Sequence, residues 1–487
     1  MKKIFFITFL LALSGCTKDF LDIQPREDIS ITEQFATLTG VKQALNGCYY
    51  KTEGLISDTY FLYPDLMGGN VSFAPIQFGS NTGIINVPLK VLGFYSFNDV
   101  ANSAAFQGFY INAYEILNNA NNILKYVDNL ADASVAQKAQ ISAEAYALRG
   151  FVHFQLVQLF GQTYNFTSDG SHKGVVYADR TFVGGVDFPA RKTVAQTYDL
   201  IVSDLQQALA KFTTNQALAG PSYSYFNTIS TKSILAKVAL QKRDWTLAKT
   251  LSNEVISSSG IALISNSNYV SQWEKPTLPV DEVILEFSAP FDSDAIIGSS
   301  VSQYYNFTQT VSGTTYGNYV ASDDLYLLFD ANDVRRTCFL NPSLPVKISA
   351  TTFQNRVFRF TKKFQDKPGT LALRLSEMYL IAAEAEARLG NTTEALLKLN
   401  VIRQRAGISS IVATPNLLDA ILLERRKELC FEGSYFFDLA RFNKNVERNL
   451  GCIASFCNLN YPNNKFVLPI PQETINVNQN MIQNEGY

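Results

Sequence analysis

The stretch from Leu371 to Gly407 constrains the fold more than any other part of the chain. Gly390 can adopt the left-handed conformation that ends a helix, and Asn391 with Glu394 has the spacing of a capping box that begins another. Before Gly390, apolar residues recur at three- and four-residue spacing and therefore share one helix face: Leu375, Met378, Tyr379, Ala382, Ala385 and Leu389. The stretch predicts two tightly joined antiparallel helices, the unit of tetratricopeptide-type arrays.

A weaker copy of this pattern lies upstream at a constant offset of 147 residues (383 − 236 = 147). Two such pairs indicate one helical scaffold with other material inserted between its units, although any two helical hairpins can align this well by chance. The matching positions are Ala383, Asn391, Ala395 and Ile402 in the later pair and Ala236, Asp244, Ala248 and Val255 in the earlier pair. Further helices are predicted at residues 32–50, 103–130, 134–160, 193–212, 416–431 and 435–442.

Two segments lack the helical period. Residues 57–99 are rich in Gly, Pro, Asn and aromatics. Residues 260–367 contain a short apolar run at 283–287, which predicts a strand, and an alternating run at 353–364, which predicts a hairpin arm. We therefore expect a mainly α protein, in which tetratricopeptide-like helical pairs form a scaffold with a large loop-rich insertion containing short β hairpins. The expected division is residues 1–15 as a signal peptide, 16–260 as an N-terminal helical region, 261–370 as the insertion and 371–487 as a C-terminal helical region, all in one compact body.

The first residues have the composition of an export signal. Lys2 and Lys3 precede an apolar run at residues 4–13, which is shorter than the roughly 20 residues that span a bilayer but suits a secretory signal. The following Leu13-Ser14-Gly15-Cys16 resembles the lipobox of bacterial lipoproteins, which implies cleavage before Cys16 and lipid attachment to it. An ordinary signal peptide with a chance cysteine is the alternative. Several acyl chains would hold the protein at a membrane durably.

The net charge and the cysteine content limit the partners and the cysteine pairing that we expect for this protein. The formal net charge is −2 without a basic stripe, so nucleic acid is not an expected partner. An exported protein can keep disulfides, and Cys452 and Cys457 flank a short loop and could pair. Cys48 and Cys430 lie in helical patterns and are expected as buried thiols. With Cys338, the cysteines after the lipobox number five, so at least one stays free.

Recognisable catalytic motifs are missing from the sequence. The only histidines are His153, which lies in an apolar helical pattern and is expected to be structural, and His172. We find no His-Glu-x-x-His, Cys-x-x-Cys, phosphate-binding glycine loop, Gly-x-Ser-x-Gly elbow or EF-hand spacing. No sequence feature pairs two carboxylates as a glycosidase requires. We therefore expect neither an enzyme nor a bound cofactor or metal.

A charged cluster at Glu424-Arg425-Arg426 and Glu428 has two interpretations. It could form a functional site, but Arg–carboxylate pairs that lock one helix to another are the more common use of such residues. We therefore expect a structural role for this cluster. The same role is expected for Arg149, Arg403, Arg405 and Arg441.

A series of short motifs runs along nearly the whole mature chain. They are residues 16–22, Tyr110 with Tyr114, Leu117 and Asn121, residues 143–149, 154–161, 375–407, 424–433, 438–441, 469–471 and 483–487. Each motif is weak alone, but their order is specific, and together they resemble the SusD/RagB family of outer-membrane nutrient-binding lipoproteins. The chain departs from the family pattern at Gly69, where many members carry Asp, at Ser434-Tyr435 and at Phe442.

The resemblance implies a fold, a partner and a location. It implies four tetratricopeptide-like pairs, a variable loop-rich region, and a SusC-like TonB-dependent transporter barrel over which the protein sits as a lid. The expected function is that of a glycan-binding subunit that captures oligosaccharide and passes it to the transporter. It would be lipid-anchored in the outer membrane and face the cell exterior. Peptide cargo, or a scaffold that binds no ligand and only stabilises the transporter, are the alternatives.

Sugar rings are bound by flat aromatic faces together with amide and carboxylate groups. The chain has 35 Phe, 24 Tyr and 2 Trp, and aromatics outside helical patterns are the least easily explained by packing. One candidate ligand-binding set is Tyr60, Tyr63, Phe73, Phe78, Phe94 and Tyr95 with Asn70, Asn81 and Asn98. The second set is Trp273, Tyr304, Tyr305, Tyr316 and Tyr319 with Asn306 and Asn318.

Overall fold

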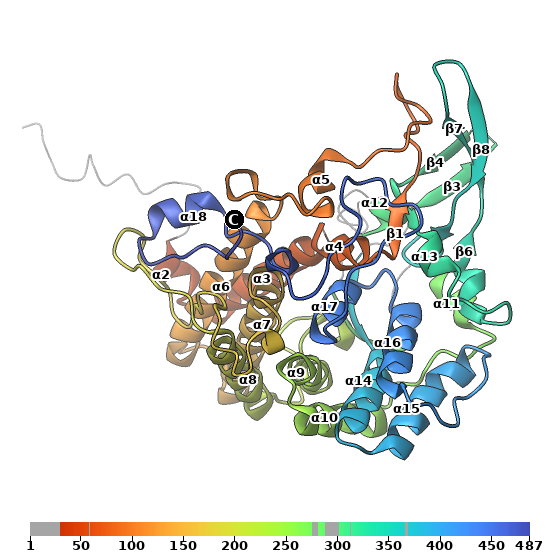
Figure 1. The fold of residues 1–487 in the computed structure, drawn as a ribbon. Coiled ribbons are helices and arrows are strands. Elements are labelled where there is room, and N and C mark those ends of the chain that lie inside the picture. The colour runs from red at the N-terminus through yellow and green to blue at the C-terminus, as the bar shows by residue number, and fades with distance from the viewer. Residues whose placement is uncertain (1–29, 58, 275–280, 288–300, 312, 366–368) are drawn as a thin grey trace, which may run out of the picture.

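The computed structural model describes residues 30–57, 59–274, 281–287, 301–311, 313–365 and 369–487. Helices make up most of the regular structure, and the strands are short (Figure 1). This confirms the mainly α fold class. Cys16 and the signal segment lie outside the described residues, so lipid attachment stays a prediction.

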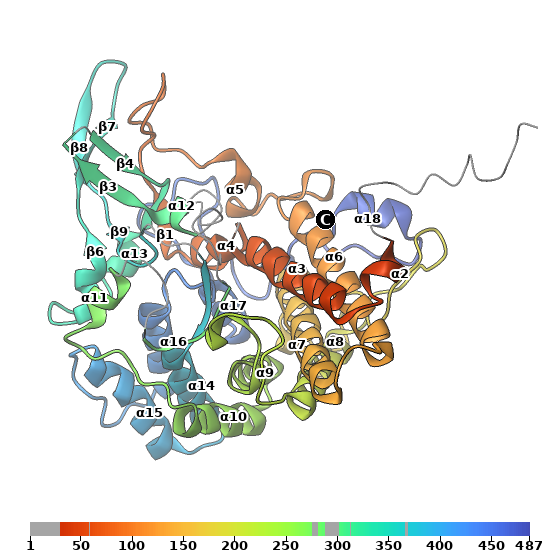
Figure 2. The ribbon, with the colours of Figure 1, turned by 180° about the vertical axis from the view of Figure 1, so that it is seen from behind.

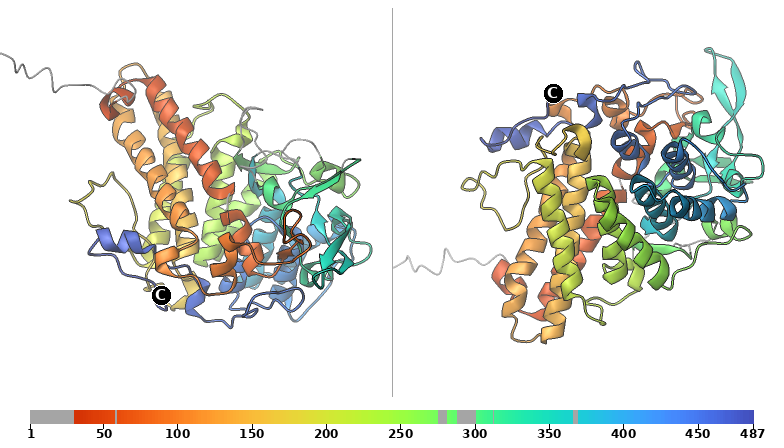
Figure 3. Two further views of the ribbon diagram at one scale, coloured as in Figure 1. Left: turned by 90° about the horizontal axis from the view of Figure 1, so that it is seen from above. Right: turned by 60° about the horizontal axis from the view of Figure 1, so that its bottom comes forward.

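The N-terminal half is built on four long helices that pack against one another. Helix α7 packs between α6 and α8, and α3 lies against both α6 and α7 (Figure 3). A capping box of Ser134 and Gln137 begins α7, since each side chain accepts a hydrogen bond from the other residue's backbone N–H. The helices of this half are α2 (Ile31–Gln34), α3 (Leu38–Ser57), α4 (Thr59–Met67), α5 (Leu89–Tyr95), α6 (Gln107–Tyr126), α7 (Val135–Phe160) and α8 (Val194–Lys211).

The second half continues the array of helical pairs. Helix α9 packs on α10, α10 on α14 and α14 on α15 (Figure 1). The matched apolar positions of the two pairs, Ala236, Ala248 and Val255 with Ala383, Ala395 and Ile402, are all fully buried. The helices are α9 (Thr228–Lys242), α10 (Trp245–Ser258), α14 (Leu375–Arg388), α15 (Thr392–Arg405), α16 (Leu417–Glu428), α17 (Tyr435–Arg441) and α18 (Gln472–Val477).

The central hairpin has its predicted turn but not its predicted cap. Gly390 has a φ of +82°, the left-handed value that ends α14. The capping box at Asn391 is absent, because the Asn391 Nδ2 donates to Glu386 Oε2 at 2.7 Å instead. In the earlier pair, the Asp244 carboxylate does cap α10 by accepting from Leu247 N–H at 3.0 Å.

The insertion is closed at its base by a pair of strands. Strand β2 (Val283–Phe287), at the position predicted from the sequence, pairs antiparallel with β10 (Thr370–Arg374). The first residues of the stretch expected as helix are therefore β10, and α14 begins only at Leu375. This pairing brings the strand just before α14 against a strand that follows α11, and so closes the hairpin-rich part of the insertion.

Four further antiparallel pairs gather at one end of the molecule (Figures 1 and 2). They are β1 (Val71–Phe73) with β5 (Tyr319–Ala321), β3 (Phe307–Thr310) with β4 (Gly313–Tyr316), β6 (Phe339–Leu340) with β9 (Phe360–Thr361), and β7 (Ser343–Lys347) with β8 (Phe353–Val357). The short helices α11 (Tyr269–Trp273), α12 (Ser302–Tyr305) and α13 (Asp323–Tyr326) lie beside them. The predicted hairpins in the insertion are confirmed.

The expectation of an irregular segment at residues 57–99 is wrong for Thr59–Met67, which form α4, and for Leu89–Tyr95, which form α5. Helix α4 occupies Thr59–Met67 even though Pro64 lies inside it and proline disfavours a helix interior. All nine residues of α4 are buried, and the helix packs against α3 and α17. Tertiary packing therefore outweighs the local preference of proline.

Buried ion pairs join neighbouring helices, which confirms the structural interpretation of the predicted arginines other than Arg426, whose Nε donates to Asn70 Oδ1 at 2.8 Å. Arg149 on α7 donates bidentately to Asp204 on α8, at 2.7 and 2.6 Å. Arg425 on α16 donates to Asp438 on α17 at 2.9 Å, and Arg441 pairs with Glu384 on α14. Such forked pairs fix orientation as well as contributing energy.

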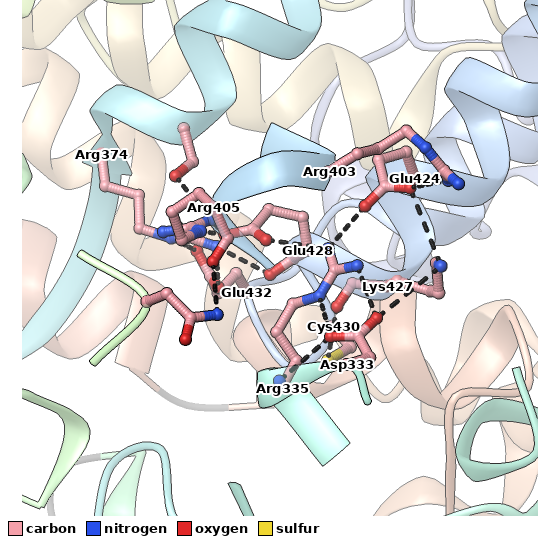
Figure 4. A network of polar contacts seen from close by, with 12 residues as sticks. Asp333, Arg335, Arg374, Arg403, Arg405, Glu424, Lys427, Glu428, Cys430 and Glu432 are labelled. Carbon is pink, nitrogen blue, oxygen red and sulfur yellow. Dashed lines mark hydrogen bonds and ion pairs between the residues drawn. The ribbon is translucent and has the colours of Figure 1, made fainter. Parts of the chain in front are cut away.

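A larger group of buried charges, the ion network, lies where the insertion meets α15 and α16 (Figure 4). Glu428 is at its centre and accepts from Arg335 at 3.0 Å, from Arg374 at 2.6 Å and from Arg405 at 2.5 Å. Burial alone would raise the pKa of Glu428, but these guanidinium groups hold it well below its usual value. The other members are Glu282, Asp333, Lys363, Arg403, Glu424, Lys427 and Glu432.

The cysteines and the buried histidine follow their predicted roles. Cys452 and Cys457 form a disulfide, and Cys48, Cys338 and Cys430 are free and buried. His153 is fully buried, and its Nε2 accepts from Ala178 N–H at 2.9 Å. Its Nδ1 therefore carries the proton that is donated to a backbone carbonyl 2.9 Å away. Burial lowers the His153 pKa to about 3, so the ring is neutral and structural.

Candidate functional site

Most of the predicted ligand-binding aromatics are core residues. In the first set the buried side chains are Tyr60, Tyr63, Phe73, Phe94, Tyr95 and Asn70, and in the second they are Trp273, Tyr304, Tyr305 and Tyr319. The ring of Tyr63, for example, meets those of Phe94 and Phe436 edge to face. Protein atoms cover the faces that a sugar would need, so we exclude these residues from the candidate site. Their segments form α4, α5, α11, α12 and short strands, which pack their aromatic sides inward.

The members of both sets that reach solvent are Phe78, Asn81, Asn98, Asn306, Tyr316 and Asn318, of which Tyr316 and Asn306 are half-buried. Phe78 and Asn81 stand at the tip of a tight loop formed by residues 76–84. The base of this loop is closed by hydrogen bonds from Ile76 N–H to Ile84 O at 2.8 Å and from Gly83 N–H to Ile76 O at 2.7 Å. The Phe78 side chain is 71% exposed at this tip.

This loop is held between two hairpins. On one side, Gln77 Oε1 accepts from Tyr316 N–H on β4 at 3.3 Å, and its amide donates to Thr314 O. On the other side, Lys347 N–H on β7 donates to Gly83 O at 2.9 Å. Gly83 has a φ of +83°, and a Cβ there would lie 2.7 Å from the Phe353 ring, so only glycine fits.

We call the surface formed by residues 76–84 and the hairpins β3–β4 and β7–β8 the crown surface. A small apolar cluster supports it from below: Ala74, Val320, Leu344, Val346, Phe358 and Phe360. Strand β8 is exposed along its whole length. Phe353 on β8 is 49% exposed, and the amides of Gln354 and Asn355 follow it. The crown surface thus offers two accessible aromatic rings, Phe78 and Phe353, with amide groups close by in sequence.

The candidate residues from the sequence did not include Phe353. The alternating pattern at 353–364 predicted a hairpin arm, and an aromatic at the start of such an arm, followed by Gln and Asn, was the available signal. The two predicted sets do meet here in part, because Gln77 joins the loop carrying Phe78 and Asn81 to the strand carrying Tyr316. Asn98 lies outside the crown surface, in the segment after α5.

Two hollows elsewhere were not expected from the sequence. One, of about 830 Å³, lies beside the segment that links α8 to α9, and its lining includes Tyr223 and Tyr225. The other, of about 580 Å³, is lined by Arg426 and Tyr435 among others. Across the residues that the structure describes, we find no helix with the length and apolarity of a membrane span.

Family models match two separate parts of the chain and leave residues 241–350 unmatched. Residues 351–487 match a model described as the SusD family, and residues 19–240 match one described as starch-binding associating with outer membrane. SusD-like protein P25 of Formosa agariphila is 24% identical across 100% of this chain and 99% of its own length. SusD-like protein P38 of the same organism is 26% identical across 63% of this chain and 67% of its own length.

Solved structures share the fold over nearly the full length. A putative sugar binding protein from Bacteroides vulgatus has a TM-score of 0.77 and 25% identity, covering 93% of this chain and 99% of that one. A surface glycan-binding protein A from Bacteroides thetaiotaomicron in complex with laminarihexaose has a TM-score of 0.70 and 18% identity, covering 92% and 99%. Both family models and the full-length likeness in sequence and in structure point to one assignment: the chain belongs to the SusD/RagB family.

Proposed function

We propose that this protein is a surface-exposed, lipid-anchored glycan-binding subunit that passes oligosaccharide to a partner SusC-like TonB-dependent transporter. The family assignment, the lipobox ending at Cys16 and the laminarihexaose complex of a structural relative support this proposal. The observation that carries it is the crown surface, where the exposed ring of Phe78 and the half-exposed ring of Phe353 are followed in sequence by amide residues.

The crown surface has the chemistry that a sugar ring requires. The faces of Phe78 and Phe353 can cover the C–H side of a pyranose ring, and Asn81, Gln354 and Asn355 can exchange hydrogen bonds with its hydroxyls. The loop carrying Phe78 is tied to both hairpins. A surface ordered before the ligand arrives loses less conformational entropy on binding.

The test uses the soluble protein that begins after Cys16, run on native gels containing plant, fungal or host polysaccharides. We expect one class of glycan to retard it, and we expect the double variant F78A/F353A to be retarded less than the wild type. Leu397→Ala is the matched control, because Leu397 is an exposed apolar residue on α15, at the other end of the molecule from β7–β8. Equal retardation of F78A/F353A and the wild type would reject the crown surface as the glycan site.

One observation favours peptide cargo as a second candidate. Strand β8 pairs only with β7 among the described residues, so its outer edge is available for an added strand. A peptide bound in this way would depend on the backbone of β8 and would tolerate loss of the Phe78 ring. Binding of extended peptides, with no retardation by any glycan and no effect of F78A, would favour this alternative.

A further inference from the structure

The larger hollow in the helical scaffold is separate from the crown surface and has the size of a ligand site. We call it the α8–α9 pocket, because its wall is the segment at residues 212–227 between these helices. Its volume of about 830 Å³ lies in the range of small-molecule sites. A second hollow of about 380 Å³ shares Gln140, Asn215 and Gln216 with it. The two hollows therefore adjoin at three amide side chains.

A buried network fixes the start of this wall. The Gln140 Oε1 accepts from both the N–H and the hydroxyl of Thr213, at 3.0 and 3.1 Å. The Gln140 Nε2 donates to Glu144 Oε1 at 2.9 Å. The same carboxylate oxygen accepts from Ala217 N–H at 3.3 Å. The wall is thus attached to α7 at two points.

The same network fixes the end of the wall. The Tyr49 hydroxyl donates to Glu144 Oε2 at 2.9 Å and accepts from Phe226 N–H at 2.9 Å. The Tyr225 ring packs edge-on against Tyr49, with centroids 5.0 Å apart. The pocket is therefore formed by the fold itself, without help from a ligand, which is the property that favours specific binding.

The lining indicates the class of ligand. Tyr223 and Tyr225 are half-buried aromatic residues in the wall, and Asn215 and Gln216 are exposed at its amide end. Among the described lining residues only Asp281 is charged, and its carboxylate accepts from Gln272 at 2.6 Å. No described cation lines the larger hollow. Lys42 lines the smaller hollow, where its charge acts on the buried Glu144 carboxylate. Aromatic faces, amides and hydroxyls with no cation in the larger hollow suit a neutral polyhydroxylated molecule.

We propose that the α8–α9 pocket is a second binding site, which takes a neutral oligosaccharide independently of the crown surface. The inference rests on the proposed function in one respect, namely that the cargo is a glycan. The volume of about 830 Å³ favours an oligomer over a single sugar, because a monosaccharide would fill only part of the larger hollow.

The test is calorimetric titration of the soluble protein with laminarihexaose, with maltohexaose and, as an anionic probe, with trigalacturonic acid. We expect F78A/F353A to retain one binding event with a neutral probe. We expect Y223A/N215A to weaken that event at least tenfold, whereas Y223F, which keeps the ring, should bind nearly normally. Tyr50→Ala is the matched control, because Tyr50 on α3 is 70% exposed and does not line the pocket.

Circular dichroism of each variant checks that the helices are intact. Unchanged titration of Y223A/N215A, equal or tighter binding of trigalacturonic acid, or no binding of either neutral probe to F78A/F353A would each overturn the second site. Weaker retardation of F78A/F353A than of the wild type in the gels would still support the crown surface. The two proposals can therefore fail separately.

Discussion

Removal of Arg374 from the ion network should destabilise the fold strongly. Its side chain is 1% exposed, and it pairs with three buried carboxylates, those of Glu282, Glu428 and Glu432. In Arg374→Met the new side chain is apolar and of similar length, so the main change is the loss of a buried positive charge. The carboxylates would remain buried with fewer donors around them.

The expected loss of unfolding free energy depends on the cationic partners that each carboxylate keeps. Glu428 would retain Arg405 at 2.5 Å and Arg335 at 3.0 Å, and Glu432 would retain Lys363 at 2.7 Å. Because partners remain, we expect the usual cost of breaking one buried pair, about 3–5 kcal/mol of unfolding free energy, and not three times that amount.

The assay is urea unfolding followed by circular dichroism. The unfolding free energies of the wild type and the variant are compared with the same dependence on urea concentration for both. Arg180→Met is the control, because the Arg180–Asp187 pair lies at the surface and its loss should leave stability within error. A loss below about 1 kcal/mol in Arg374→Met would refute the reasoning, because it would mean that the remaining cations satisfy all three carboxylates.

Three further predictions concern single groups. Burial raises the Glu53 pKa from 4.5 to about 7, so this carboxyl group lowers the stability of the fold as the pH rises from about 4.5 through 7. Glu53→Gln should therefore stabilise the fold at pH 8 by up to about 3 kcal/mol and change its stability little at pH 4. An equal effect at both pH values in urea unfolding would contradict this prediction. Cys16→Ala should move the protein from the membrane fraction to the soluble fraction, and unchanged retention would count against the lipid anchor. The double variant C452A/C457A should lose about 2 kcal/mol of unfolding free energy, which corresponds to the loop-closure entropy of a short loop. If the variant and the wild type still differed in stability in reducing buffer, the loss would have a cause other than the disulfide.

The sequence predicted the scaffold better than the site. The apolar period around Ala383 and the glycine at Gly390 are local signals, and each helix they predicted is present. The apolar run that predicted the strand at Val283–Phe287 was also a local signal. Its partner β10 lies far along the chain, and no sequence signal indicated that the two strands pair.

The site could not be predicted because burial depends on distant residues. Tyr63 lies next to Pro64 in a segment of loop-like composition, yet it is covered by Phe106 of the segment before α6 and by Phe436 of α17. Phe78, in similar local sequence, is exposed because its loop projects between two hairpins. Composition cannot distinguish these two environments, and the long-range contacts that decide them have no periodic pattern.

The pairing of β2 with β10 also has a consequence for how binding specificity can change. These strands bring the two ends of the hairpin-rich region together beside the helices, so the region enters and leaves the scaffold at one place. Replacing the residues between the two strands would leave the contact of α10 with α14 in place. A different set of hairpins could therefore be grafted onto the same helices if Asp333, Arg335 and Lys363 of the ion network were kept, which makes this protein a suitable frame for exchanging recognition loops.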